Sequence, residues 1–513
     1  MKHKVRVRFA PSPTGGLHLG GVRTVLYNYL FAKQNKGDFI VRIEDTDQTR
    51  FVPGAEEYIF ECLKWCGLEP NESVIHGGEF APYRQSERKA IYREYAEQLV
   101  KDGHAYYAFD TPEELERMRE LLRAKGSHSL QYDHHSRENM NNSVRLLPEE
   151  TQKLLDAGTP YVIRIKVEAG DVVSFTDMIR GEMSFDTNTV DDKVLLKADG
   201  MPTYHLAVVV DDYLMKITHA FRGEEWLPSA PVHVLLWKHL FGIENMPQWA
   251  HLPLILKPDG NGKLSKRDGD RLGFPVYAMD WNDPKTNELI KGFKELGFLP
   301  EAFINLLAVL GWNDGTEQEI FSKEEMINKF SIDRVHKGGA KFDFEKAKWY
   351  NHEWIKRSDA KRLSPDVKPF FEVKEVDISD SAYFEKVIDL VKERCTLLAD
   401  FYDQSHFFFI DPSKFDLAAV APKWDEAKKN YFETFSIRCD SVNWTVADIE
   451  TAFKELATER NIKPGDLQML LRVMLVGSKM GPGVFVIAET IGKERTLNRI
   501  NSAIAAFDNA KNN

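Results

Sequence analysis

Cysteine is scarce in this chain: four of its 513 residues are cysteines. Four thiols are too few for a disulfide scaffold. Cys62 and Cys66 lie four residues apart in an amphipathic segment, and no second Cys or His pair lies nearby in the sequence. We therefore interpret these two cysteines as buried packing residues and not as zinc ligands.

Long hydrophobic runs and an excess of positive charge are also missing. No apolar run approaches the roughly 20 residues that a membrane-spanning helix needs, and the N-terminus MKHKVRVRFAPSP lacks the apolar core of a signal peptide. We expect a cytoplasmic protein with no membrane partner. The net charge is −11. This charge argues mildly against a general nucleic-acid coat protein, whereas a local basic face would still suit an RNA partner.

The most informative stretch runs from residue 5 to residue 47. Apolar and basic residues alternate over VRVRF, which predicts a strand. PSPTGG then predicts a turn, the segment from Gly20 onward a helix, and FIVRI a second strand. In such a βαβ unit, ligands bind where strands end and the helix begins. Its glycines admit a close ligand and its helix N-terminus suits a phosphate, although a Gly-rich turn can also be only a tight turn.

These motifs resemble those of a known enzyme family. PSPTGGLHLGG followed by RIEDTD resembles the signature of class I aminoacyl-tRNA synthetases, specifically the bacterial-type glutamyl-tRNA synthetases. Residues 18–21 (HLGG) take the place of that family's HIGH tetrapeptide, and residues 263–267 (KLSKR) match its KMSKS signature. The resemblance continues through FRGEEWL and ELGFLPEAFINLLAVLGW to the C-terminal segments. It therefore covers essentially the whole chain.

The resemblance implies an α/β nucleotide-binding catalytic domain, Rossmann-like and of the HIGH type. It also implies an α+β insertion that binds the acceptor end of tRNA, and an all-α C-terminal anticodon-binding half. From about residue 280 onward the sequence pattern predicts helices, and we interpret the apolar run 205–210 as a buried strand. We expect the domains at 1–109 and 201–259 (the halves of the catalytic domain), 110–200 (the insertion), 260–359 (the KMSKS loop and a stem-contact helical domain), and 360–414 and 415–513 (two anticodon-binding helical domains).

The resemblance also implies which residues form the sites. Catalysis is implied for His18, Gly20, Gly21, Lys263 and Lys266. Glutamate binding is implied for Arg8, Ala10, Ser12, Glu44, Tyr204 and Arg222. ATP binding is implied for His18, Gly20, Glu225, Leu254, Ile255 and Lys266, and anticodon recognition for Arg394 and Arg472.

The implied reaction is that of a glutamate–tRNA ligase, which activates L-glutamate with ATP and transfers it to the 3′ end of tRNA(Glu). Mg²⁺ would arrive with ATP. Some members of the family carry a zinc-binding cysteine cluster in the insertion, but residues 110–200 contain no cysteine, and we predict no zinc and no other protein-bound metal. The resemblance further suggests a monomer.

Three alternatives remain open. The first is a non-discriminating enzyme that also charges tRNA(Gln) with glutamate. The second is a class I adenylyltransferase that acts on a small substrate, which the long helical C-terminal half disfavours. The third is a non-catalytic RNA-binding factor, which the presence of His18, Lys263 and Lys266 disfavours.

Overall fold

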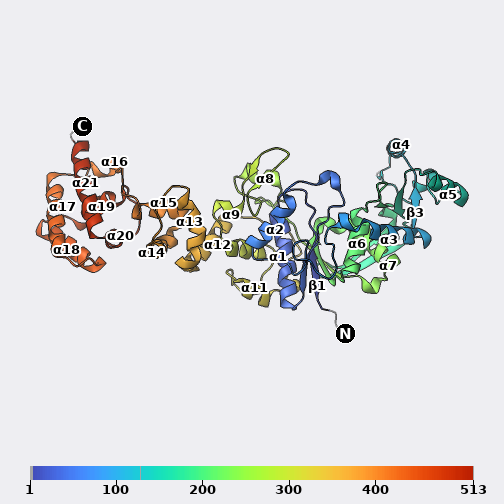
Figure 1. Ribbon diagram of the computed structural model, residues 1–513, viewed down its shortest axis with the longest axis horizontal. Coiled ribbons are helices and arrows are strands. Elements are labelled where there is room, and N and C mark those ends of the chain that lie inside the picture. The colour runs from blue at the N-terminus through green and yellow to red at the C-terminus, as the bar shows by residue number, and fades with distance from the viewer. Residues whose placement is uncertain (1–3, 128, 512–513) are drawn as a thin grey trace. The chain divides into compact units, whose positions relative to one another are not determined.

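The computed structural model describes residues 4–127 and 129–511, and of Lys266, Arg267, Asp270 and Lys511 it describes the backbone alone. Contacts divide the chain into two units, residues 1–295 with 300–344 and residues 296–299 with 345–513. The first unit mixes strands and helices, whereas the described residues of the second form helices and turns (Figure 1). This division confirms the predicted fold class, an α/β part followed by a helical half.

A mostly parallel sheet forms the centre of the first unit. In the described residues it has six strands in the spatial order β2-β1-β8-β9-β5-β6, and only β6 runs antiparallel to its neighbour. Parallel strands place their carboxyl ends at one edge, where α/β proteins bind ligands. The strand bounds are β1 (Arg6–Phe9), β2 (Asp38–Val41), β5 (Val172–Asp177), β6 (Gly181–Asp186), β8 (His219–Gly223) and β9 (Gln248–Leu252).

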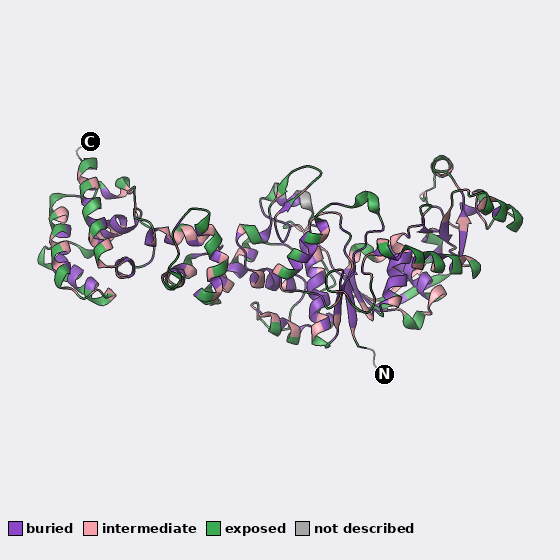
Figure 2. Cartoon of the chain, viewed as in Figure 1, coloured by how far each residue is buried: buried purple, intermediate pink, exposed green. Residues whose placement is uncertain are grey.

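Helix α1 (Leu19–Gln34) connects the first two strands and packs against β1, β2 and β8. Leu19, Val22, Leu26 and Leu30 recur at helical spacing and are completely buried. Figure 2 shows this helix and the central strands as mostly buried. The apolar face of α1 therefore fixes the helix on the sheet, with its N-terminus at the carboxyl end of β1.

The prediction of a strand at residues 205–210 is wrong. These residues lie in helix α6 (Tyr204–Leu214), which packs against α3 (Lys89–Lys101) and α7 (Ala230–Leu240). Residues 206–212 of α6 are all buried, so the helix has no wide polar face and its sequence shows no 3.6-residue period. Periodicity alone does not distinguish a helix that is buried on several sides from a buried strand.

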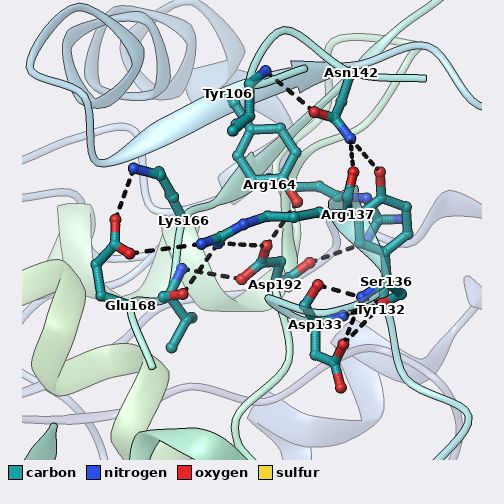
Figure 3. A network of polar contacts seen from close by, with 12 residues as sticks. Tyr106, Tyr132, Asp133, Ser136, Arg137, Asn142, Arg164, Lys166, Glu168 and Asp192 are labelled. Atoms are coloured by element: carbon teal, nitrogen blue, oxygen red, sulfur yellow. Dashed lines mark hydrogen bonds and ion pairs between the residues drawn. The ribbon is translucent and has the colours of Figure 1, made fainter. Parts of the chain in front are cut away.

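The predicted insertion at 110–200 contributes to two sheets. Strands β5 and β6 belong to the central sheet, whereas a separate sheet, three-stranded in the described residues, has the order β3-β4-β7. A buried polar network supports this second sheet (Figure 3): Asp192 accepts hydrogen bonds from Tyr106 and Arg137, and its carbonyl oxygen accepts one from Arg164. The bounds are β3 (Ala105–Ala108), β4 (Val162–Ile165) and β7 (Val194–Leu196).

The other elements of the first unit are short strand pairs and further helices. Two small strand pairs, β10 with β13 and β11 with β12, interrupt the helical pattern predicted from about residue 280. The strands are β10 (Ile255–Leu256), β11 (Trp281–Asn282), β12 (Leu289–Ile290) and β13 (Ala340–Lys341). The helices are α2 (Ala55–Trp65), α4 (Pro112–Ala124), α5 (Pro148–Asp156), α8 (Lys266–Leu272), α9 (Phe293–Leu296), α10 (Pro300–Val309) and α11 (Lys323–Lys329).

The second unit is built from amphipathic helices that pack in two successive groups, α13 to α15 and α17 to α21. Their bounds are α12 (Phe344–Arg357), α13 (Ala360–Glu372), α14 (Ser381–Val391), α15 (Asp400–Ser405), α16 (Leu417–Val420), α17 (Glu426–Arg438), α18 (Val446–Glu459), α19 (Pro464–Val476), α20 (Val484–Ile491) and α21 (Lys493–Lys511). Among the described residues, no helix has the length and apolar character needed to span a membrane.

The prediction that Cys62 and Cys66 are packing residues is confirmed. Both thiols are buried, and both are free, as are Cys395 and Cys439. Burial raises the pKa of Cys62 to about 12 and the pKa of Cys66 well above its ordinary value. These thiols therefore contribute to the core as small apolar side chains.

Candidate active site

A cavity of about 1110 Å³ opens at the carboxyl ends of the central strands. It is lined by thirteen of the fourteen residues to which the sequence analysis assigned catalysis, glutamate binding or ATP binding; the fourteenth, Lys266, begins α8, and its side chain lies outside the described part of the structure. The thirteen are Arg8, Ala10, Ser12, His18, Gly20, Gly21, Glu44, Tyr204, Arg222, Glu225, Leu254, Ile255 and Lys263.

His18 is the N-cap residue of α1. Its Nδ1 accepts a hydrogen bond of 3.2 Å from the backbone N–H of Gly20. Because Nδ1 accepts, the proton of the neutral imidazole lies on Nε2, which makes Nε2 the donor nitrogen. The same helix N-terminus presents backbone N–H groups and the positive end of the helix dipole to the cavity.

The two glycines after His18 differ in what surrounds them. A Cβ added at Gly21 would lie 2.7 Å from Cδ1 of Leu17, whereas one added at Gly20 would meet only Nδ1 of His18, at 3.8 Å. Gly21 therefore permits close packing within the protein. Gly20 keeps space open beside the cavity that it lines.

Arg8 and Glu44 belong to a buried group of charged side chains. The guanidinium of Arg8 donates two hydrogen bonds of 3.1 Å to the carboxylate of Asp212. Arg42 donates to Glu44 at 3.0 Å and lies 2.9 Å from Asp212. Burial alone would raise the pKa of Asp212, but Arg8 and Arg42 lower it below its ordinary value. Burial raises the pKa of Glu44, and the charges of Arg42 and Arg8 oppose that rise. The group therefore fixes the positions of Arg8 and Glu44 at the cavity.

The sequence analysis did not assign Arg42 or Asp212 to the site. Both are buried, at 0% and 3% exposure; Arg42 lies within an apolar segment, and Asp212 follows an apolar run and the buried Asp211. A charged residue inside an apolar segment, or at its end, is the signal that could have found them, because a buried charge requires a partner. Asp212 is brought to Arg8 across 204 positions of sequence, so no local pattern could have paired the two.

Two residues from later in the chain, Lys263 and Glu225, form an ion pair of 2.6 Å at the cavity. Lys263 follows β10, and Glu225 lies in the short 3₁₀ segment Glu224–Ser229 after β8. The neighbouring Glu224 accepts a hydrogen bond of 2.9 Å from the backbone N–H of Leu254. Two loops predicted to bind ATP are thus joined to one another.

Comparisons with known proteins agree with this geometry. The family model for tRNA synthetases class I (E and Q), catalytic domain, matches residues 4–349. The glutamate–tRNA ligase of Christiangramia forsetii is 50% identical over 505 residues, which cover 98% of this chain and 99% of that protein. The relative of the same name from Flavobacterium psychrophilum is 50% identical over 509 residues, which cover 99% and 100%. The chain belongs to the glutamate–tRNA ligase family.

A solved structure supports the same assignment. The crystal structure of a glutamate tRNA ligase from Elizabethkingia meningosepticum, in complex with its amino acid, matches with a TM-score of 0.93 and 49% identity, covering 98% of this chain and all of that one. The glutamate-tRNA synthetase of Elizabethkingia anophelis matches with a TM-score of 0.90 and 50% identity, again covering 98% and 100%. The resemblance seen in the sequence motifs is confirmed.

The helical half of this glutamate–tRNA ligase family member matches the family model for an anticodon binding domain over residues 362–504. Within it, burial lowers the pKa of Arg472, and the nearby charge of Arg394 lowers it further. Arg472 donates a hydrogen bond of 3.1 Å to the carbonyl oxygen of Gly481 and one to that of Pro482. Arg472 therefore holds a turn, while Arg394 is exposed.

In the described residues, no three His, Cys, Asp or Glu side chains are grouped so that they could hold a metal ion. The absence of zinc remains a prediction from the sequence.

Proposed function

We propose that this member of the glutamate–tRNA ligase family joins L-glutamate to the 3′ end of tRNA(Glu) at the expense of ATP. The observation that carries the proposal is the single cavity that collects thirteen predicted site residues from segments between Arg8 and Lys263. Activation of glutamate joins its α-carboxylate to the α-phosphate of ATP and releases pyrophosphate. A hydroxyl of the terminal adenosine of tRNA then attacks the activated carbonyl, which forms the glutamyl ester and breaks the bond to the α-phosphate, so that AMP is released.

Both steps depend on positioning and on charge stabilisation more than on a protein nucleophile. His18, with its Nε2 proton, donates a hydrogen bond to the triphosphate. Lys263 and Lys266 neutralise the charge that builds up on the departing pyrophosphate. Mg²⁺ enters bound to ATP, with phosphate oxygens and waters as its ligands.

The substrate glutamate requires cations for its side-chain carboxylate and an anion for its ammonium group. Arg8 and Arg222 line the cavity as cations, and guanidinium groups suit carboxylates. Glu44 accepts hydrogen bonds from the ammonium group. It lines the cavity, and a hydrogen bond of 3.0 Å from Arg42 holds it there. The remaining predicted glutamate-binding residues, Ala10, Ser12 and Tyr204, also line this cavity.

For tRNA, we propose that the helical half binds the anticodon and that exposed Arg394 distinguishes the glutamate anticodon from the glutamine anticodon. The exposed guanidinium is free to stack on or donate to a base. Arg472 supports this surface by holding the turn at Gly481. The enzyme acts as a monomer in the cytoplasm.

The test is the charging of radiolabelled glutamate onto purified tRNA(Glu) and tRNA(Gln). We expect charging of tRNA(Glu) alone, loss of charging in Lys266→Ala, and charging of both tRNAs by Arg394→Gln. Charging of both tRNAs by the unchanged enzyme would support the non-discriminating alternative. Charging of neither would contradict the proposal as a whole.

A further inference from the structure

Arg222 is a buried cation, and its hydrogen-bond partners in the described residues are all neutral. Its side chain is 7% exposed. Nε donates to Nε2 of His251 at 2.8 Å, and Nη1 donates to the hydroxyl oxygen of Tyr204 and to Nδ1 of His233, both at 3.2 Å. Its guanidinium carbon also lies 4.7 Å from the ring centre of Trp249. The remaining nitrogen, Nη2, is buried and has no hydrogen-bond partner in the part of the chain that the structure describes.

The other arginine of the cavity is bound differently. Arg8 forms two hydrogen bonds with the carboxylate of Asp212, so its charge is compensated by the protein. Among the described residues, no carboxylate forms an ion pair with Arg222. A desolvated cation without a counter-charge is costly, and a carboxylate supplied by a ligand repays that cost.

The hydrogen bonds define the protonation of the two histidines. A guanidinium only donates, so Nε2 of His251 and Nδ1 of His233 must both accept, and both rings are neutral. The proton of His251 lies on Nδ1, which donates to Asp177 at 2.6 Å. The proton of His233 lies on Nε2, which donates to Nδ1 of His205 at 3.1 Å. Each tautomer is thus fixed from both sides of the ring.

The fold places the two histidines around the guanidinium from different elements. Arg222 and His251 are register partners on the adjacent strands β8 and β9. His233 approaches from α7 and is 1% exposed. Burial and the charge of Arg222 lower the pKa of His233 well below its ordinary value, so the ring stays neutral at pH 7.

The cations around this cluster all lower the pKa values of its histidines. Arg8 also lowers the pKa of His233, and Arg180 that of His251, while Lys193 lowers that of His205. Asp177 opposes these effects, because its hydrogen bond raises the pKa of His251, but burial is the largest effect and the pKa remains lowered. Neutral histidines therefore surround Arg222 over the physiological pH range.

We propose that His233 and His251 are positioning residues that hold Arg222 as an uncompensated cation for the side-chain carboxylate of glutamate. In that arrangement the enzyme prefers glutamate to its neutral amide, glutamine, because an amide cannot replace the missing counter-charge. A carboxylate in place of either histidine would bind Arg222 equally well but would remove the preference. This inference rests on the proposed function, since it assumes that glutamate is the substrate.

The test compares three variants at one position. His233→Asn keeps a neutral acceptor near the place of Nδ1, His233→Asp has nearly the same shape but brings a negative charge, and His233→Leu has no acceptor. His239→Gln is the control, because His239 lies on the same helix and is stacked on His104, outside the cavity lining. The measurements are KM for glutamate, KM for ATP and the inhibition constant of glutamine, in charging assays with saturating tRNA(Glu).

We expect His233→Asn and His239→Gln to keep KM for glutamate within about threefold of the unchanged enzyme. His233→Leu and His233→Asp should raise it roughly 10- to 100-fold, the factor expected from losing one interaction with a charged group. KM for ATP should change little in all four. His233→Asp should also reduce the preference for glutamate over glutamine, whereas His233→Asn should not.

Equal values for His233→Asp and His233→Asn would overturn the role of neutrality, and an unchanged KM for glutamate in His233→Leu would overturn the positioning role. If His233→Leu does not fold, His251→Gln against His251→Leu repeats the comparison at the other acceptor. An unchanged enzyme that fails to charge glutamate would instead contradict the proposed function, so the two failures are distinguishable.

Discussion

Nζ of Lys263 lies 2.6 Å from Oε1 of Glu225, and both side chains are substantially exposed, at 51% and 39%. The first residue belongs to the KLSKR loop and the second to the segment that follows β8. An ion pair this exposed contributes little to stability. The ion pair instead holds the ammonium group of Lys263 at the cavity, where we expect it to exchange Glu225 for the phosphates of ATP.

Lys263→Ala should therefore reduce activity without reducing stability. We expect ATP–pyrophosphate exchange, measured with tRNA present, to slow roughly 100-fold, as when one charge-stabilising group is removed. The midpoint of thermal unfolding should not change. Lys291→Ala is the matched control, because Lys291 also forms an exposed ion pair, with Asp280 at 3.1 Å, but does not line the cavity. Equal losses of exchange in the two variants would contradict this role of Lys263.

His18 should show two separable roles, as helix cap and as donor. His18→Asn keeps a side-chain acceptor for the N–H of Gly20, whereas His18→Ala does not. We expect both variants to lose roughly 100-fold in pyrophosphate exchange. Only His18→Ala should also lose about 1 kcal/mol in the free energy of unfolding, measured with denaturant. Full activity in His18→Asn would show that the Nε2 donor is not used.

Gly20 and Gly21 should respond differently to alanine. Gly20→Ala places a methyl group where the nearest protein atom is 3.8 Å away, so the free energy of unfolding should not fall. KM for ATP should nevertheless rise roughly tenfold, since even a small displacement at a reacting centre is costly. Gly21→Ala brings a methyl group to 2.7 Å from Cδ1 of Leu17, the end of a flexible side chain that has to shift, and should lower the free energy of unfolding by about 1 kcal/mol. An unchanged KM for ATP in Gly20→Ala would indicate that the nucleotide does not bind beside Gly20.

The stability of the first unit should fall as the pH falls below 6.5. Burial lowers the pKa of His205 to about 4, so between pH 6.5 and 4 the unfolded chain binds a proton that the folded chain does not. This single histidine removes up to about 1.4 kcal/mol for each pH unit in that window. The free energy of unfolding of His205→Gln should therefore depend less steeply on pH between 6.5 and 5. The same slope in the variant and the unchanged protein would contradict the assignment.

Much of the fold could be predicted from local patterns. The alternation in VRVRF predicted β1, and the helical spacing of Val22, Leu26 and Leu30 predicted α1, because each pattern has one clear periodicity. Residues 205–210 were predicted as a strand but form part of a helix, because their sequence lacks a clear period. Helix α6 is buried on several sides, so its sequence has no polar face to reveal its period.

The sequence by itself determined the family of this protein and the residue types of its cavity, because the HLGG and KLSKR motifs are short, contiguous and specific. Only the tertiary structure decided how those residues are charged and held. Asp212 reaches Arg8 across 204 positions, and His251 reaches Arg222 through strand register. Whether a buried cation is compensated by a carboxylate or left for a ligand depends on which distant side chains the fold brings within hydrogen-bonding distance, and no local pattern records that.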